Sequence, residues 1–124
     1  MTPHFTDKEL SCPHCGILPS QEAQDALERV RVRVGHPLRV SSGLRCPAYN
    51  QQVSSTGPNG PHTKGAFDLA ISGERALQLV IAAVQEGATG IGVKQHGPHE
   101  KRFIHIDFLP NADGQPRPTV WSYP

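Results

Sequence analysis

The sequence predicts a small α+β domain, in which an antiparallel sheet carries a metal site on one face and two helices on the other. The chain has 124 residues, enough for one hydrophobic core but not two, so we expect a single domain over residues 1–124. Some segments repeat their apolar residues with the period of a helix and others with the period of a strand. Twelve glycines and twelve prolines predict long ordered loops between these elements.

Composition excludes several classes of function. The formal net charge is +1, from 12 basic and 11 acidic residues spread along the chain, so no basic surface for nucleic acid is expected. The longest apolar run, 79–84, is too short to cross a membrane. The start, MTPHFTDKEL, lacks the features of a secretory signal, so we expect synthesis and retention in the cytoplasm. Three cysteines, an odd number, fit a reducing compartment and argue against a disulfide framework.

The first half of the chain predicts one helix and one short strand. Residues 1–19 form an irregular entry segment with a C-x-x-C motif. A helix should begin after Ser20, which can cap it, and end at Gly35, because alanine, leucine and valine recur at helical spacing between them. Residues 38–41 resemble a short strand. Residues 46–61 are mostly polar or turn-forming and predict a long surface excursion, with one short helical turn.

The second half predicts strands at 67–71, 90–94 and 102–109. Between the first two, a helix should run from Ser72 to about Glu86. Its expected packing stripe consists of large apolar residues: Leu77, Val80, Ile81 and Val84. The tail after residue 110 ends in Val120, Trp121 and Tyr123, which we expect to form a hydrophobic clasp across the domain.

Polar residues share the faces of these strands that point away from the core. Alternation places Asp68 opposite its apolar neighbours, and it places His105 and Asp107 together on one face of the last strand. If the two strands are neighbours, Asp68 and His105 lie side by side. His62, six positions before Asp68, can then complete a group of three from the adjoining loop.

Such a group is suited to a hydrolytic zinc ion, which takes three nitrogen or carboxylate ligands and keeps one position open for water. Zinc lowers the pKa of that water to around 7, so hydroxide becomes available at neutral pH. Any one of the three residues, taken singly, is more often a solvated polar residue. Their combination with the motifs around them favours the metal site: His62, Asp68 and His105.

Several motifs, in order, resemble the zinc D-alanyl-D-alanine carboxypeptidases and their relatives, which include peptidoglycan endopeptidases and the hedgehog signalling domain. They are HFTDKEL-SCPHCG, RVSSGLRCPAYN, H-x-x-G-A-F-D, GIGV, RFIHIDF and a closing W-S-Y. The resemblance covers most of the chain and implies a hedgehog-like fold. It also implies that His62, Asp68 and His105 bind zinc and that Arg45, with Ser42 nearby, binds substrate. A guanidinium can pair with a carboxylate through two hydrogen bonds, although an arginine that only anchors its loop is an open alternative.

The chain departs from the family pattern in two places. The usual H-x-x-G-x-A-x-D has one residue more than HTKGAFD, so the deletion must be absorbed near Gly65 if Asp68 is to keep its facing. The general base is also unassigned. Glu100 and His99 lie five and six positions before His105, and we favour Glu100 because carboxylates are the commoner bases in zinc peptidases. Asp107 is expected to orient a ligand histidine, with a cross-strand salt bridge as the alternative.

The remaining polar residues give weaker signals. Cys12 and Cys15, with His4 and His14 nearby, offer only two sulfurs for a second zinc, and Cys46 is distant in sequence, so ordinary thiols are expected. The sequence leaves open whether Cys12 and Cys15 bind a metal.

The resemblance implies a zinc metallopeptidase that hydrolyses an amide bond in the peptidoglycan stem peptide, and we expect a monomer. D-Ala-D-Ala carboxypeptidase and endopeptidase activity both remain open. The expected absence of a signal suggests action on the cell wall after lysis, as for a phage or prophage endolysin, or from a virion. No nucleic acid or membrane partner is expected. The alternatives are a non-catalytic zinc-containing binding module on the same fold and a metal-free structural domain.

Overall fold

The computed structural model describes residues 2–54 and 57–124. The helices of this part of the chain are α1 (Asp7–Leu10), α2 (Gln21–Val34), α3 (Pro47–Val53) and α4 (Gly73–Gln85). The strands are β1 (Val40–Ser42), β2 (Ala66–Ala70), β3 (Gly90–Lys94), β4 (Phe103–Asp107) and β5 (Thr119–Ser122). Short 3-10 turns occur at η1 (Gly57–Asn59), η2 (Pro61–Thr63) and η3 (His99–Lys101). None of the helices in this described part combines the length and apolar character needed to cross a bilayer.

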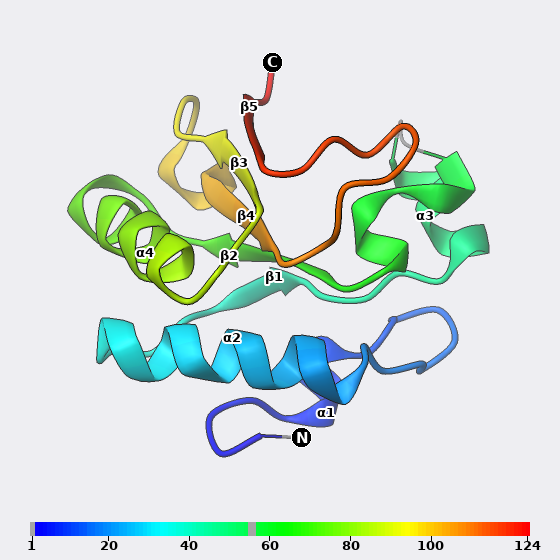
Figure 1. Ribbon diagram of the computed structural model, residues 1–124, viewed down its shortest axis with the longest axis horizontal. Coiled ribbons are helices and arrows are strands. Elements are labelled where there is room, and N and C mark those ends of the chain that lie inside the picture. The colour runs from blue at the N-terminus through cyan, green and yellow to red at the C-terminus, as the bar shows by residue number, and fades with distance from the viewer. Residues whose placement is uncertain (1, 55–56) are drawn as a thin grey trace.

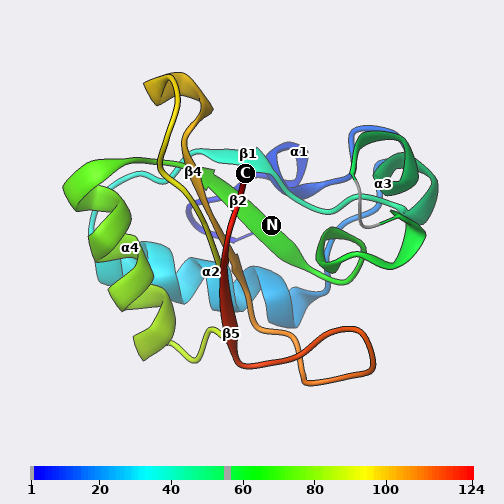
Figure 2. The same ribbon diagram turned by 90° about the horizontal axis from the view of Figure 1, so that it is seen from above.

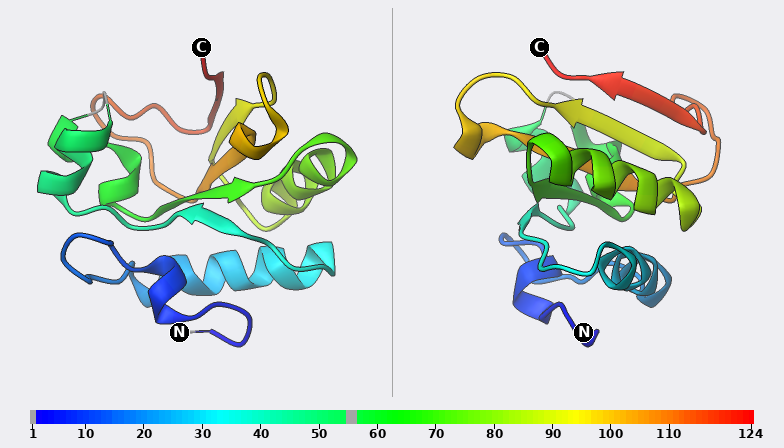
Figure 3. Two further views of the ribbon diagram at one scale, coloured as in Figure 1. Left: turned by 180° about the vertical axis from the view of Figure 1, so that it is seen from behind. Right: turned by 90° about the vertical axis from the view of Figure 1, so that its left-hand side faces the viewer.

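The described strands form one mixed sheet with the order β1-β2-β4-β3-β5. The α+β class predicted from the sequence is confirmed, but the sheet is not wholly antiparallel, because β5 pairs in parallel with β3. The two lie side by side and point the same way in the right-hand view of Figure 3. The tail predicted as a clasp is therefore a strand. Its direction follows from β4, which ends at Asp107 opposite Gly90, so that a return loop starts β5 beside the start of β3.

The helix α2 forms where its sequence signals predict it. The Ser20 side chain accepts a hydrogen bond from the backbone N–H of Ala23 (3.1 Å), and Gly35 ends the helix in the left-handed conformation with φ 76°. The helix lies beneath the sheet in Figure 1, and α4 lies at its side. Leu27 and Val30 of α2 are fully buried in the core. A helix that sequence reasoning missed, α1, begins with a capping box between Thr6 and Glu9.

The packing stripe predicted for α4 is wrong. Three of its large apolar residues are exposed, namely Leu77, Ile81 and Val84, and only Val80 packs partly against the core. The buried face consists mainly of small residues with one leucine: Ala76, Leu79, Ala82 and Ala83. Small side chains allow the helix to approach its neighbours closely, so burial on this helix follows side-chain fit rather than side-chain size.

The core lies on one face of the sheet, where the apolar residues of β2, β3 and β4 meet the two longer helices. These strand residues are Phe67, Leu69, Ile91, Ile104 and Ile106. Strand alternation then turns the intervening residues to the opposite face. On that face the register sets Asp68 opposite His105 and Ala66 opposite Asp107. The α3 region and the loop after β4 lie at one end of the sheet (Figure 2), near the start of β2.

Candidate metal centre

Two histidines and one aspartate converge on the open face of the sheet. His62 Nε2 lies 3.1 Å from Asp68 Oδ1, and His105 Nδ1 lies 3.2 Å from the same oxygen. One nitrogen or oxygen of each residue lies within 4.8 Å of the others. The three residues are 6%, 8% and 1% exposed, respectively. A polar group this well buried needs close partners, and here two imidazole nitrogens and one carboxylate oxygen turn toward one common point.

The shortened spacing between His62 and Asp68 is absorbed before the strand begins. Gly65, with φ 118°, occupies a backbone conformation that favours glycine, and β2 starts at the next residue. His62 lies on the turn η2, whose last bond joins the N–H of Lys64 to the carbonyl of Pro61. Asp68 therefore keeps the facing that places its carboxylate beside His105.

Hydrogen bonds fix the orientation of both imidazole rings. His62 Nδ1 donates to the Gly43 carbonyl (2.9 Å), and His105 Nε2 donates to Asp107 Oδ2 (2.8 Å). A neutral ring with its proton on that nitrogen would present the lone pair of His62 Nε2 or of His105 Nδ1 to the common point, where both atoms now face Asp68 Oδ1. A ligand histidine held by an acceptor on its second nitrogen is the usual arrangement in metal proteins.

Asp107 is held in turn by Arg117, a residue that the sequence analysis did not single out. Arg117 Nε donates to Asp107 Oδ1 (2.9 Å) and Nη2 donates to Oδ2 (2.8 Å). Asp107 is completely buried, and a buried carboxylate without such a partner would be costly. Arg117 lies between two prolines in an irregular segment, where no periodicity or spacing relates it to β4.

The charges of this group support one another. Burial alone would raise the pKa of Asp68, but hydrogen bonds from His105 and His62 hold it well below its usual value. Burial would also raise the pKa of Asp107, but its hydrogen bonds with His105 and Arg117 lower it. Burial would lower the pKa of His105, yet its contacts with Asp107 and Asp68 raise it. Both carboxylates are therefore ionised at neutral pH, and their negative charges favour a positive charge on the His105 ring between them.

A cavity of about 600 Å³ opens over these residues. Its lining includes His62, Asp68 and His105, together with aromatic residues of β4 and the C-terminal strand region that pack against one another: Phe103, Trp121 and Tyr123. Trp121 packs on His105 with ring centroids 4.8 Å apart. Gly92 makes this possible, because a Cβ there would lie 2.7 Å from Trp121 Nε1. Gly90 plays the same part for Asp107, whose carboxylate oxygens would lie 2.4 Å from an added Cβ.

Arg45 enters the cavity from the segment after β1. Its Nε donates to Ser42 Oγ (3.1 Å), its Nη1 donates to Asn50 Oδ1 (3.1 Å), and its Nη2 lies 3.8 Å from Asp68 Oδ2. Asn50 was not singled out from the sequence. Arg45 lines the cavity, whereas Ser42 contacts the guanidinium and is not among the lining residues.

The comparison with protein families decides the class of this chain. The family model described as Peptidase M15 matches residues 3–107. The chain belongs to the peptidase M15 family. The resemblance seen in the sequence motifs is thereby confirmed. No match was found among the curated proteins or among the solved structures.

Membership of the M15 family supports a metal-dependent peptidase, which acts on a peptide. The donor set of this M15 peptidase fits such a metal, since two imidazole nitrogens and one carboxylate oxygen are ligands that zinc accepts in catalytic sites. The family match ends at Asp107, so Arg117 and Trp121 complete the site from outside the matched range.

The two residues considered as a general base lie apart from the lining of the cavity. Glu100 and His99 are exposed on the turn η3, which connects β3 to β4. The chain reaches the cavity again at Phe103, the first residue of β4. Among the described residues that line the cavity, Asp68 is the one carboxylate, and its contacts with both histidines suit it to a ligand role.

Proposed function

We propose that this M15 peptidase is a zinc enzyme that hydrolyses an amide bond in the stem peptide of bacterial peptidoglycan. The observation that supports it best is the convergence of His62, Asp68 and His105 at a cavity that also receives Arg45. The three residues would hold zinc. A zinc ion held there would supply Lewis acidity toward the scissile carbonyl and toward water.

The substrate proposal relies on Arg45. Stem peptides carry free carboxylates, and a guanidinium remains charged at every relevant pH and can bond a carboxylate through two donors. Ser42 and Asn50 hold two nitrogens of Arg45, which orients the third toward Asp68 and the cavity. A substrate carboxylate bound there would direct the neighbouring amide toward the three ligands. The resemblance to D-Ala-D-Ala carboxypeptidases and to endopeptidases makes both bonds candidates.

Proton transfer is assigned to Glu100, with His99 as the alternative. The acceptor would take the proton from water and return it to the leaving amine. Support for these two residues is their position in the chain before His105 and next to the Phe103 end of the cavity. The turn η3 would have to approach the substrate for either residue to act.

The biological setting follows from the substrate. A peptidoglycan peptidase made inside a cell reaches its substrate after lysis or from outside, so we propose an endolysin of a phage or prophage, or a virion component. The proposal takes the protein as a monomer that uses neither nucleic acid nor membrane as a partner.

Hydrolysis of defined substrates tests the proposal. Purified protein, depleted of metal by a chelator and reloaded with zinc, is incubated with purified peptidoglycan and with a synthetic stem pentapeptide ending in D-Ala-D-Ala. Release of free D-alanine would identify a carboxypeptidase, and new amino groups in solubilised fragments would identify an endopeptidase. His105→Ala should abolish either activity, and Arg75→Ala, at an exposed position on α4, serves as the control. Zinc-loaded protein that binds peptidoglycan without cleaving either substrate would contradict the enzyme and support the binding module.

A further inference from the structure

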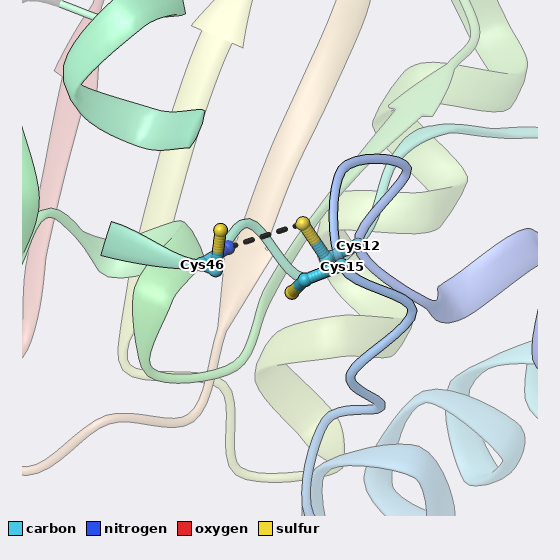
Figure 4. Close-up of side chains that lie close together, drawn as sticks. All are labelled: Cys12, Cys15 and Cys46. Atoms are coloured by element: carbon cyan, nitrogen blue, oxygen red, sulfur yellow. Dashed lines mark hydrogen bonds between the residues drawn. The ribbon is translucent and has the colours of Figure 1, made fainter. Parts of the chain in front are cut away.

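Three cysteines from two distant segments meet on the side of the molecule where the entry segment approaches α3. Cys12 and Cys15 lie between α1 and α2, and Cys46 directly precedes α3. Their sulfur atoms all lie within 4.8 Å of one another, and Figure 4 shows the three side chains together. All three are free thiols. The sequence alone left Cys46 apart from the other two, because it lies 31 positions after Cys15.

The backbone around Cys12 and Cys15 forms a compact loop. The N–H of Gly16 donates to the Cys12 carbonyl (2.8 Å), and the N–H of Cys12 donates to the Ile17 carbonyl (2.9 Å). Gly16 adopts φ 76°, which lets the chain turn back directly after Cys15. This loop holds both cysteines at one place, with Cys12 buried and Cys15 exposed, and C-x-x-C is a spacing common in structural zinc sites.

Backbone donors surround the sulfur of Cys12. The N–H of Cys46 lies 3.3 Å from it, drawn as a dashed line in Figure 4, and the N–H of His14 lies 3.4 Å from it. Burial would raise the pKa of the Cys12 thiol, but these amides and that of Cys15 lower it to about 7. Donors of this kind stabilise the thiolate, the form in which cysteine binds metals.

A fourth potential ligand lies beside the sulfur of Cys46. His14 Nδ1 is 3.4 Å from Cys46 Sγ. The His14 ring is stacked on Tyr49 of α3, with centroids 6.1 Å apart and an angle of 11° between the planes. The ring is therefore held on the Cys46 side of the cluster. Three thiols and one imidazole make up the Cys₃His set of many structural zinc proteins.

We propose that Cys12, Cys15, Cys46 and His14 bind a second zinc ion, with a structural role. Sulfurs that share a tetrahedral zinc at 2.3 Å lie about 3.8 Å apart, so the three sulfurs would need a small contraction, and the His14 ring would turn in from beside Cys46. A disulfide accounts for the cluster less well, because it would use two sulfurs and leave the third and His14 without a role. All four positions would be filled by protein, as in closed structural sites, whereas His62, Asp68 and His105 leave one open.

This site would connect the entry segment to the loop that carries Arg45. The two segments already touch, since the N–H of Leu44 donates to the Leu10 carbonyl (3.0 Å). They pack so closely at Gly43 that an added Cβ would lie 2.6 Å from the Leu10 oxygen. Gly43 also accepts the hydrogen bond from His62, and Arg45 directly precedes Cys46. Zinc at the cysteines would therefore stabilise the position of both His62 and Arg45 without touching the substrate.

Cobalt substitution separates the two metal sites. Thiolates bound to Co²⁺ give an intense sulfur-to-metal charge-transfer absorption in the near ultraviolet, and the centre formed by His62, Asp68 and His105 contains no sulfur. Wild-type protein titrated with Co²⁺ should develop this absorption, and His105→Ala should retain it in full. Failure of the band to appear in both proteins would overturn the proposal, whether or not the peptidase is active.

Zinc content of the purified full chain provides a second, independent measurement. Wild-type protein should retain about two zinc ions per chain after dialysis, and Cys15→Ser about one. Cys15 is exposed, so this substitution disturbs packing least among the three. Pro13→Ala, in the same loop, is the matched control and should retain both ions. Equal zinc content in wild type and Cys15→Ser would contradict the site. His14→Ala should bind zinc more weakly, and unchanged affinity in that variant would remove His14 from the ligand set.

Discussion

Arg117 holds both carboxylate oxygens of Asp107, from a segment that begins after the last residue of β4. The two bonds measure 2.9 and 2.8 Å, and the same carboxylate accepts from His105 Nε2 at 2.8 Å. Arg117 in the C-terminal loop thus fixes the carboxylate of Asp107, and Asp107 in turn orients the His105 ring toward the candidate metal centre. The carboxylate between them is completely buried.

Loss of this arginine should weaken metal binding. Arg117→Ala leaves Asp107 with one charged partner fewer, so the orientation of His105 is less well defined. Changes of this kind in residues behind metal ligands lower affinity by about 10- to 100-fold. Zinc dissociation constants from competition with a chelator would measure the effect. Arg75→Ala, on the exposed side of α4, controls for the loss of one positive charge. Equal zinc affinity in Arg117→Ala and wild type would refute a positioning role.

A side chain at position 92 should displace Trp121. Gly92→Ala puts a methyl group where the indole ring now lies, since the added atom would be 2.7 Å from its Nε1. Overpacking of this kind costs about 1–3 kcal/mol. Trp121 is the single tryptophan of the chain, so its fluorescence reports the displacement directly. The double variant Gly92→Ala with Trp121→Leu should lose less stability than the sum of the two single changes. If the stability losses of the two single variants simply add in the double variant, the absence of a side chain at Gly92 does not serve to accommodate Trp121.

Arg45→Lys should impair substrate binding and leave metal content unchanged. Lysine keeps the charge but not the fork that pairs with a carboxylate through two bonds. We expect KM for the stem pentapeptide to rise about tenfold or more, which corresponds to roughly 1.4 kcal/mol or more of lost binding. A substrate with an amidated C-terminus is the matched comparison, because wild type and variant should cleave it with similar KM. If Arg45→Lys loses as much on the amidated substrate, Arg45 does not recognise the carboxylate.

Substitution of the two residues on η3 tests the proton acceptor. Removal of a general base typically lowers kcat by about 10²-fold or more. We expect a loss of this size for Glu100→Gln and for Glu100→Gln with His99→Ala, while His99→Ala alone has a smaller effect. Zinc content should stay at the wild-type level, because both residues are exposed and lie outside the ligand cluster. Lys101→Ala, on the same turn, is the control. Full activity of the double variant would show that a group other than Glu100 and His99 accepts the proton.

Local periodicity was sufficient to predict the strand faces. Alternation in β2 and β4 places Asp68 and His105 on the face opposite the core, and the register then sets them opposite each other. The start and end of α2 likewise follow from Ser20 and Gly35, whose roles depend on neighbouring backbone alone. Features with local physical causes could be read from the sequence.

Features that depend on distant contacts could not. The stripe of α4 was assigned to its larger residues, although fit against the sheet buries Ala82 and Ala83 and exposes Leu77. The parallel pairing of β5, the partnership of Arg117 with Asp107 and the approach of Cys46 to Cys12 each join segments with no shared periodicity. Sequence spacing carries no information about such pairs until the chain path is known.

The return of the chain alongside β3 has a practical consequence for anyone trimming this protein. A fragment that stopped where the family match stops, at Asp107, would keep every candidate zinc ligand, so its sequence would suggest a complete metal site. It would nevertheless lack Arg117, which holds Asp107, and Trp121, whose indole ring packs on His105. Expression boundaries, affinity tags and fusions are therefore better chosen with Tyr123 counted as part of the working unit.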